Sequence, residues 1–147
     1  MALKDSLFKN VRFFSRIQHS MHFPAELKYT NSHEWVRLET DGTLTLGITD
    51  TAQDMLGDLV FCGDAKVGET LKAGDAACVV ESVKAASDVY MPVDGKIIAF
   101  NEALSSAPES INSQPYASWL LKIQPSSSAD LTVFLDAAAY QAAVAAA

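Results

Sequence analysis

Short runs of alternating apolar and polar residues fill the first part of the chain. Residues Thr43 to Ile48 alternate between polar and apolar side chains, and Tyr29 to Leu38 contains Trp35, Val36 and Leu38, which predicts two β-strands. Asp41-Gly42 stands between them, and we expect a tight primed turn there because glycine supplies the positive φ that such a turn requires. This stretch therefore predicts a β-hairpin.

The β pattern breaks after the second strand, in the segment TDTAQDML from Thr49 to Leu56. Thr49 or Asp50 can accept hydrogen bonds from the free N–H groups of a first helical turn, and Gly57 suits a C-terminal cap. We therefore expect a short helix with Met55 and Leu56 as its apolar anchors.

Further short strands follow, separated by turns that contain glycine. No strand-helix-strand alternation is present, which argues against a parallel sheet and for an all-β sandwich or barrel. The segment from Ser105 to Pro115 is rich in serine and asparagine and is expected to be a loop, with a helical turn from Pro108. The expected strands are Leu59 to Cys62, Ala76 to Val80, Lys96 to Phe100 and Trp119 to Ile123.

The end of the chain changes character after Pro125. It reads DLTVFLDAAAYQAAVAAA after a run of serines, and alanine is the strongest helix former. Asp136 can accept hydrogen bonds at the start of the alanine run. We therefore expect a C-terminal helix.

One lysine stands between two strand-like segments near the middle of the chain. Cys78 to Val80 and Val89 to Met91 flank a short polar stretch that contains Lys84, which predicts a hairpin with this lysine at its tip. The nearest carboxylates, Glu81 and Asp88, are several residues away. Such a lysine is ordinarily a solvated surface charge, but the strand and turn patterns on both sides indicate a scaffold that presents it.

Length and composition narrow the class of protein. The 147 residues, 49% of them hydrophobic, fit one domain with a buried core. A net charge of -7 argues against a nucleic-acid partner, and no apolar run is long enough to span a bilayer. Cys62 and Cys78 do not form a CxxC pair, so the sequence signals neither a metal site nor a redox dithiol. We expect buried free thiols in a reducing compartment.

Residues 1 to 20 differ from the rest of the chain. Four of the eleven basic residues lie there beside a single acidic residue, and apolar side chains recur at helical spacing, as in a mitochondrial transit peptide. The alternative is an upstream extension of a chain that starts at Met21, which would place the protein in the cytoplasm. Both interpretations separate residues 1 to 20 from a domain of residues 21 to 147.

Many residues match one known family in the same order and at the same spacing. The central match is Glu81-Ser82-Val83-Lys84. The others are Lys28-Tyr29-Thr30, His33-Glu34-Trp35-Val36, Gly47-Ile48-Thr49, Ala52-Gln53, Leu56-Gly57-Asp58, Val67-Gly68, Pro92, Gly95, Asn101, Leu104, Pro108, Asn112, Pro115-Tyr116 and Trp119. Over nearly all of Leu27 to Tyr140 the sequence resembles the H proteins of the glycine cleavage system, which are lipoyl carriers.

The resemblance implies a mainly β fold, a flattened barrel or sandwich of the lipoyl-carrier type with a short helix after the first hairpin and a C-terminal helix. It implies that Lys84 carries lipoate in amide linkage. The chain would then be a non-catalytic carrier that takes the aminomethyl group of glycine from a pyridoxal-phosphate glycine decarboxylase to a folate-dependent aminomethyltransferase. A flavin-containing dihydrolipoyl dehydrogenase would reoxidise the arm, and lipoate-attaching enzymes would modify the lysine.

The same resemblance implies that Ser32, Glu34 and Asp88 border the cleft in which a loaded arm rests, where a carboxylate would stabilise an amine. The alternative is that Glu34 and Asp88 are solvated and that Ser32 only shapes the start of a strand. His33 is expected to be a packing or surface residue rather than a catalytic one.

The sequence departs from the family pattern at three places. Met55 occupies a position where members often have histidine. The segment Pro115 to Trp119 lacks the glycine that usually precedes this tryptophan, and Phe61 to Val67 lacks the proline that usually precedes Val-Gly. These changes affect local turn geometry and leave the Lys84 hairpin intact.

Other functions remain open from the sequence. A biotin carrier would have methionines flanking its lysine, and a lipoyl domain of a 2-oxoacid dehydrogenase usually has an acidic residue before it, whereas Val83 and Ala85 flank Lys84. A relay protein that donates lipoyl groups to other enzymes, or an unmodified structural paralogue, would share the same scaffold. An enzyme with a nucleophilic cysteine and His33 would need an electropositive setting, which this acidic chain does not indicate.

Overall fold

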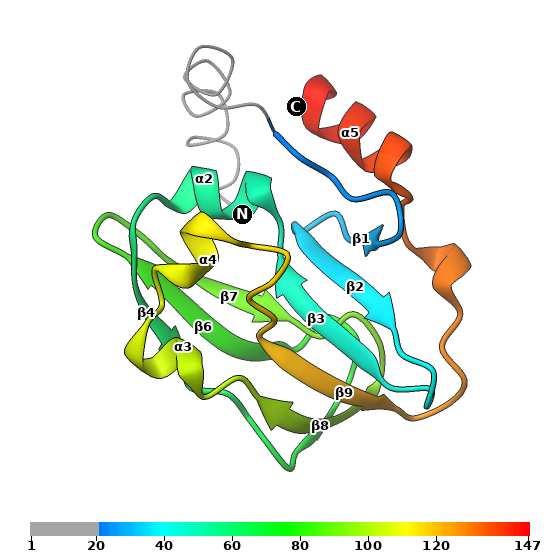
Figure 1. The fold of residues 1–147 in the computed structure, drawn as a ribbon. Helices are drawn as coiled ribbons and strands as arrows, with labels where there is room; N and C mark the ends of the chain where they lie inside the picture. Colours follow the sequence, from blue (N-terminus) through cyan, green and yellow to red (C-terminus); the bar gives the residue numbers. More distant parts are fainter. Residues whose placement is uncertain (1–20) are drawn as a thin grey trace.

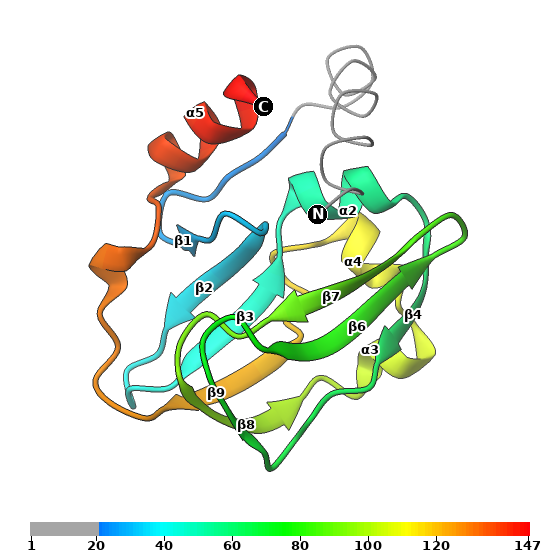
Figure 2. The ribbon, with the colours of Figure 1, turned by 180° about the vertical axis from the view of Figure 1, so that it is seen from behind.

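Two antiparallel β-sheets packed face to face form the body of the protein in the computed structural model (Figure 1). The structure describes residues 21–147, and the leader predicted for residues 1 to 20 lies outside them. The larger sheet has the strand order β1-β2-β3-β9-β8-β5 and the smaller sheet the order β4-β6-β7 (Figure 2). The predicted mainly β sandwich is therefore confirmed. In chain order the strands are β1 (Lys28–Tyr29), β2 (Glu34–Leu38), β3 (Leu44–Ile48), β4 (Leu59–Gly63), β5 (Thr70–Leu71), β6 (Ala76–Ser82), β7 (Ala86–Tyr90), β8 (Gly95–Phe100) and β9 (Leu121–Pro125).

β2 and β3 form the predicted first hairpin, with a different turn from the one expected. The amide of Gly42 donates to the carbonyl oxygen of Glu39 (3.0 Å), and in this turn only Gly42 has a positive φ, 90°. A primed turn requires positive φ at its first central residue, so the predicted turn type is wrong. The Asp41 carboxylate explains the difference, because it accepts from both the amide (3.0 Å) and the hydroxyl (2.7 Å) of Thr43 and fixes an ordinary turn.

The strand expected from Tyr29 to Leu38 is divided into β1 and β2. His33, between them, has a positive φ of 71°, and its amide donates to the carbonyl oxygen of Thr30 (3.2 Å). The amide of Thr30 donates in turn to the carbonyl oxygen of Glu34 (2.9 Å). The chain therefore folds back on itself, and β1 pairs antiparallel with β2.

Short helices close the ends of the sheets. The hydroxyl of Thr49 accepts from the amide of Ala52 (3.1 Å) and Gly57 ends the first helix, as predicted. The helical turn expected from Pro108 is confirmed as α4. The rest of the loop expected from Ser105 to Pro115 begins with the end of another helix, which was not predicted, and β5 was also not predicted. None of the helices within residues 21–147 combines the length and apolar character that crossing a membrane requires. The helices are α2 (Asp50–Leu56), α3 (Ala103–Ser106), α4 (Ser110–Ser113) and α5 (Ala137–Ala146), with a 3-10 turn at Leu131–Val133.

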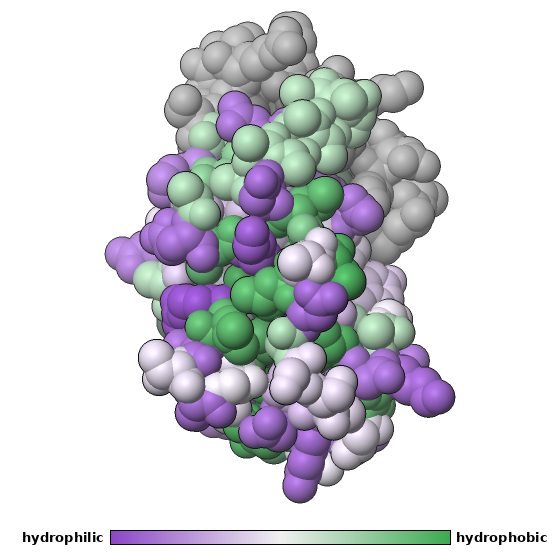
Figure 3. Space-filling view, turned by 90° about the vertical axis from the view of Figure 1, so that its right-hand side faces the viewer, coloured by the Kyte–Doolittle hydropathy of each residue, from purple (hydrophilic) through white to green (hydrophobic). Residues whose placement is uncertain are grey.

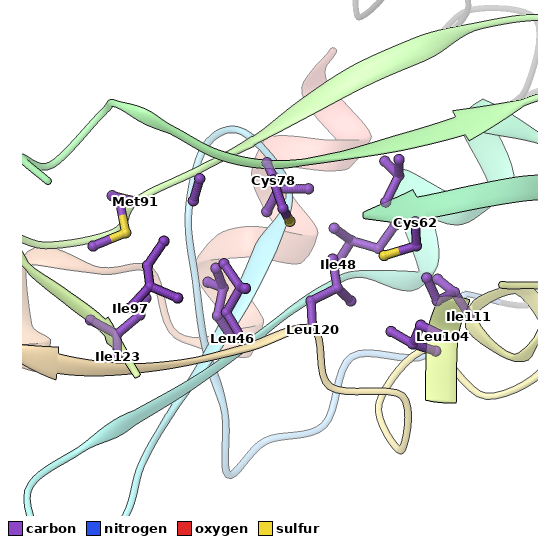
Figure 4. Packing of buried hydrophobic residues seen from close by; sticks show 14 of the residues in the cluster. Leu46, Ile48, Cys62, Cys78, Met91, Ile97, Leu104, Ile111, Leu120 and Ile123 are labelled. Carbon is purple, nitrogen blue, oxygen red and sulfur yellow. The ribbon is translucent and has the colours of Figure 1, made fainter. Parts of the chain in front are cut away.

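Apolar side chains fill the space between the two sheets (Figure 4). Leu46, Ile97 and Ile123 of the larger sheet are fully buried. The smaller sheet contributes Cys62 and Cys78, which are buried and not joined in a disulfide, so the expectation of buried free thiols is confirmed. α3 and α4 each add one buried side chain beside β4.

α5 packs on the larger sheet through a separate aromatic cluster. Its Tyr140 is buried and stacks on Tyr29 of β1, with ring centroids 4.7 Å apart. Asp136 accepts from the amide of Ala139 (2.8 Å), so the predicted C-terminal helix and its cap are confirmed. The other side of the helix is mostly exposed alanine. Figure 3 shows this weakly hydrophobic surface in pale green at the top of the molecule, where α5 lies.

Candidate functional site

Lys84 lies at the tip of the hairpin that β6 and β7 form. The strands pair in antiparallel register from Ala76 opposite Tyr90 to Glu81 opposite Ala86. Residues 83–85 make the turn, and Lys84 is exposed. The predicted hairpin is confirmed. Its first strand ends at Ser82 and not at Val80, and its second strand begins at Ala86 and not at Val89, so both extend further toward the lysine than predicted.

Ser82 fixes the backbone of this turn. Its Oγ accepts hydrogen bonds from the amides of Lys84 (3.3 Å) and Ala85 (3.1 Å), and its amide donates to the carbonyl oxygen of Ala85 (2.7 Å). Ser82 is buried, so water competes little for these bonds. This role was not predicted, and the signal that could have found it is a serine placed directly before a turn of small residues.

A second turn, between α2 and β4, lies beneath the lysine loop. The amide of Val83 donates to the carbonyl oxygen of Asp58 (3.3 Å). The Lys84 side chain lies over Gly57, where a Cβ would be 3.3 Å from Cε and 3.7 Å from Nζ of the lysine. The loop is therefore held from the strand side by Ser82 and from below by this turn.

The smaller sheet gives the lysine an acidic and apolar surrounding. β4, β6 and β7 contain no lysine or arginine, and Glu81 and Asp88 are their charged residues. Val83, next to the lysine, is 76% exposed. Lys84 is therefore the single cation of this sheet and its connecting hairpin turn, and an exposed primary amine on a rigid turn is well placed to be acylated.

A cleft of about 520 Å³ opens beside the far end of β7. Glu34 lies in its lining and is 2% exposed, so it is not a solvated surface residue. Its Oε1 accepts from the hydroxyls of Thr30 and Ser32, the latter at 2.6 Å. Its Oε2 accepts from the amide of Tyr90 (3.2 Å). The structure thus brings Ser32 and Glu34 together in one cleft.

The remaining lining of the cleft is mostly apolar and comes from segments far apart in the sequence. Met91 and Pro92 follow β7, whereas Phe134 and Leu135 follow the 3-10 turn that precedes α5. Neither these residues nor Thr30 was predicted to belong to the site. Only the folded topology brings them together, so no local pattern could have identified them.

Asp88 does not line the cleft. It is exposed on β7 and pairs across the smaller sheet with β6. Because side chains alternate along a strand, Asp88 lies on the same face of β7 as Tyr90, two residues nearer to Lys84. The structure therefore places Asp88 between the lysine and the cleft.

His33 and Met55, two residues of uncertain role in the sequence, are packing residues. His33 is buried, and its Nδ1 lies 2.6 Å from the hydroxyl oxygen of Tyr140 on α5. Met55 is buried on the inner side of α2. Of the two roles expected for His33, packing or surface exposure, the structure shows packing.

The two thiols have the electrostatic setting of structural cysteines. Burial raises the pKa of Cys62 to about 12 and also raises the pKa of Cys78. A nucleophilic cysteine needs the opposite, a pKa lowered by nearby positive charge. The geometry therefore does not support an enzyme that uses either thiol.

Comparison with known proteins identifies one consistent family. A family model described as Glycine cleavage H-protein matches residues 27–147. The glycine cleavage system H protein of Bordetella pertussis is 60% identical over 122 residues, which cover 83% of this chain and 98% of the relative. Glycine cleavage system H protein 2 of Pseudomonas aeruginosa is 58% identical over 123 residues, which cover 84% of this chain and 95% of the relative.

A solved structure agrees with the sequence relatives. The crystal structure of a glycine cleavage system H protein from Mycobacterium marinum matches with a TM-score of 0.73 at 37% sequence identity, and the match covers 82% of this chain and 97% of that one. These findings confirm the resemblance that the sequence motifs indicate.

Proposed function

The chain belongs to the glycine cleavage H-protein family, and from that membership we propose that it is the lipoyl carrier of a glycine cleavage system, with Lys84 as the attachment residue. The observation that carries the assignment of Lys84 is its exposed place on a turn whose backbone is fixed by Ser82 and by the carbonyl of Asp58. A modifying enzyme can reach the amine there, and the sandwich determines where the arm is anchored.

The surroundings of Lys84 fit an acyl group in amide linkage. Within residues 21–147 the lysine ammonium has neither an ion pair nor a hydrogen bond, so the loss of its charge leaves no partner unsatisfied. The exposed Val83 offers apolar surface beside an apolar chain. When bound, lipoate supplies a disulfide that opens to take up an aminomethyl group and closes again on oxidation.

In this proposal the protein supplies anchoring and placement, and partner enzymes supply the catalysis. Glycine decarboxylase would load the arm, an aminomethyltransferase would unload it, and dihydrolipoyl dehydrogenase would reoxidise it, after a lipoate-attaching enzyme has modified Lys84. Once the carrier has docked, tethering raises the effective concentration of the arm at each active site. The chain itself performs no catalytic step.

The cleft at Glu34 fits the amine end of a loaded arm. Its carboxylate is buried and fixed by the hydroxyls of Thr30 and Ser32 and by the amide of Tyr90. A carboxylate in a partly apolar cleft attracts an ammonium group more strongly than a carboxylate in water does. Asp88, on the same face of β7, would attract the same group on its way to the cleft.

The test is intact-mass spectrometry and peptide mapping of the chain purified from cells that lipoylate other proteins. We expect a lipoyl or octanoyl increment on the peptide that contains Lys84, and its loss in Lys84→Arg. An unmodified Lys84 in those cells would overturn the proposal and favour an unmodified paralogue. The same spectrum shows whether the mature chain begins at Met1 or near Met21.

A deletion of the gene separates the carrier role from lipoate relay. Loss of glycine cleavage with normal lipoylation of other enzymes is the expected result. Loss of lipoylation on those enzymes would show instead that the chain serves mainly as a lipoyl donor.

A further inference from the structure

Asn112, on α4, uses its whole side-chain amide to hold the turn beneath the lysine loop. Its Nδ2 donates to the carbonyl oxygen of Gly57 and to Oε1 of Gln53, both at 2.9 Å. Its Oδ1 accepts from the amide of Leu59, also at 2.9 Å. Two of these partners are acceptors and one is a donor, so only one orientation of the amide satisfies all three. Figure 1 shows α4 beside α2 and β4.

The turn that Asn112 holds is the one that contacts the lysine loop. Asp58, directly after Gly57, accepts from the amide of Val83 (3.3 Å). Gly57 itself lies beneath the Lys84 side chain, so that a Cβ there would be 3.3 Å from the lysine Cε. A path of direct contacts therefore leads from Asn112 through this turn to the lysine.

The conformation of Gly57 leaves its selection to neighbouring groups. Its φ of 84° and ψ of -159° lie in a region that is nearly restricted to glycine, and because glycine adopts many other conformations equally readily, its own preferences do not hold it there. Its amide donates to the carbonyl oxygen of Gln53 (2.9 Å), and its own carbonyl oxygen accepts from Asn112. Without the Asn112 bonds, the turn would be free to relax.

We infer that Asn112 is a positioning residue for the acylation of Lys84: it fixes the Gly57-Asp58 turn and so keeps the lysine loop in the conformation that a lipoate-attaching enzyme binds. The inference rests on the proposed function of Lys84. If the loop samples other conformations, only the competent fraction binds the enzyme. The apparent KM for the carrier then rises, whereas kcat at saturation is retained.

Asn112→Asp removes this support with the smallest change in shape. A carboxylate oxygen replaces Nδ2 and faces two acceptor oxygens, while the acceptor for the amide of Leu59 is kept. Gln53 cannot compensate by turning its amide, because its Nε2 already donates to Asp50 (2.8 Å).

Asn101→Asp is the matched control. Nδ2 of Asn101 donates to the carbonyl oxygen of Trp119 (2.9 Å), so the same substitution removes the same kind of bond away from the lysine loop. Both variants and the wild type are tested as full-length unmodified chains with a purified lipoate ligase, lipoate and ATP. For Asn112→Asp we expect KM to rise about tenfold with kcat within about twofold, and for Asn101→Asp we expect wild-type values.

Amide hydrogen exchange, measured by NMR, reports the loop conformation independently of the ligase. We expect the Val83 amide to exchange about tenfold faster in Asn112→Asp, with the amides of β3 and β9 unchanged. If Asn112→Asp does not fold, Asn112→Ala removes the two donated bonds, and also the acceptor for the amide of Leu59, without adding a charge, and it has the same expected results.

The possible failures are distinguishable. An unchanged KM in the folded Asn112 variant, an equal rise in Asn101→Asp, or unchanged exchange at Val83 would overturn the inference while Lys84 remains the acceptor. A wild-type chain that takes no lipoate would overturn the proposed function, and the inference with it.

Discussion

The hydroxyl oxygen of Tyr140 lies 2.6 Å from Nδ1 of His33, and this contact joins the C-terminal helix to the turn that precedes the cleft carboxylate Glu34. The same hydroxyl lies 2.8 Å from Oγ1 of Thr49, the N-cap residue of α2. All three of the interacting residues are buried. One phenol group thus holds α5, the His33 turn and the start of α2 together.

We expect Tyr140→Phe to lower the free energy of unfolding by about 1–3 kcal/mol, because the variant keeps the ring but removes one buried hydrogen-bond partner from His33 and one from Thr49. Chemical denaturation measures the change. Tyr90→Phe, at a half-buried position of the cleft, is the control and should stay close to the wild type. Equal losses in both variants would show that the Tyr140 bonds contribute no stability.

Glu34→Gln tests the cleft. If the carboxylate holds the amine of the loaded arm, we expect the neutral variant to release the aminomethyl group to water about tenfold faster, a loss of about 1.4 kcal/mol of protection. A single-turnover assay on the loaded, folded protein measures the rate. Glu39→Gln, which removes an exposed surface ion pair with Arg37, is the control for loss of a charge. The same release rate in Glu34→Gln and the wild type would exclude a role for this carboxylate.

Gly47 lies opposite Trp35 in the β2–β3 pair, where a Cβ would be 2.5 Å from Cζ2 of the tryptophan. We expect Gly47→Ala to lower the free energy of unfolding by about 3 kcal/mol and to change the near-UV spectrum of Trp35, because the ring must move from its bond with the carbonyl of Pro115 (3.1 Å).

Gly42→Ala is the control for this substitution. A Cβ at Gly42 meets open space, so its positive φ alone should cost about 1–2 kcal/mol and leave the tryptophan spectrum unchanged. If Gly47→Ala behaved in the same way as this control, the close packing of Trp35 on Gly47 would be wrong.

Stability should fall as the pH rises above 9, because burial raises the pKa of Cys62 from 9.0 to about 12. Below pH 9 the thiol is protonated in both states, and its contribution is fully present. Between pH 9 and 12 the unfolded state loses its proton first and is favoured, by about 1.4 kcal/mol at pH 10.

Denaturation at pH 8 and pH 10, compared between the wild type and Cys62→Ala, isolates this contribution from that of the buried tyrosines. We expect the wild type to lose about 1.4 kcal/mol more than the variant. The same loss in both proteins would show that the thiol titrates at its ordinary pKa in the fold.

The sequence was most informative where local chemistry determines the backbone. Thr49, Gly57 and Asp136 act locally as caps, so α2 could be predicted with both of its ends and α5 with its start. The turn at His33 was not predicted, because a non-glycine residue with positive φ is uncommon. Two contacts hold it here: the amide of Glu34 donates to the hydroxyl of Thr30, and the His33 ring contacts the hydroxyl of Tyr140.

The candidate site also contains one part that local sequence determines and one part that only the tertiary fold assembles. The place of Lys84 at a hairpin tip could be predicted because strand patterns converge on it within a few residues, whereas its role as attachment residue is implied only by the family resemblance. The cleft could not be predicted, because its lining joins residues 29–32 and 34 with residues 73–74, 90–92 and 133–135, which only the tertiary fold brings together. The hydrogen bond from Asn112 to the turn at Gly57 could not be predicted for the same reason, because the two residues are 55 positions apart in the sequence.

The place of Cys62 and Cys78 between the sheets decides which sulfur atoms can react with one another. They are the two cysteines of the chain, and both are buried and held in the protonated form. Thiol-disulfide exchange requires a thiolate within reach, so in the proposed carrier an arm on Lys84 would not form a mixed disulfide with either of these cysteines. Electrons placed on such an arm would then leave it only through a partner of the carrier and not through the carrier's own thiols.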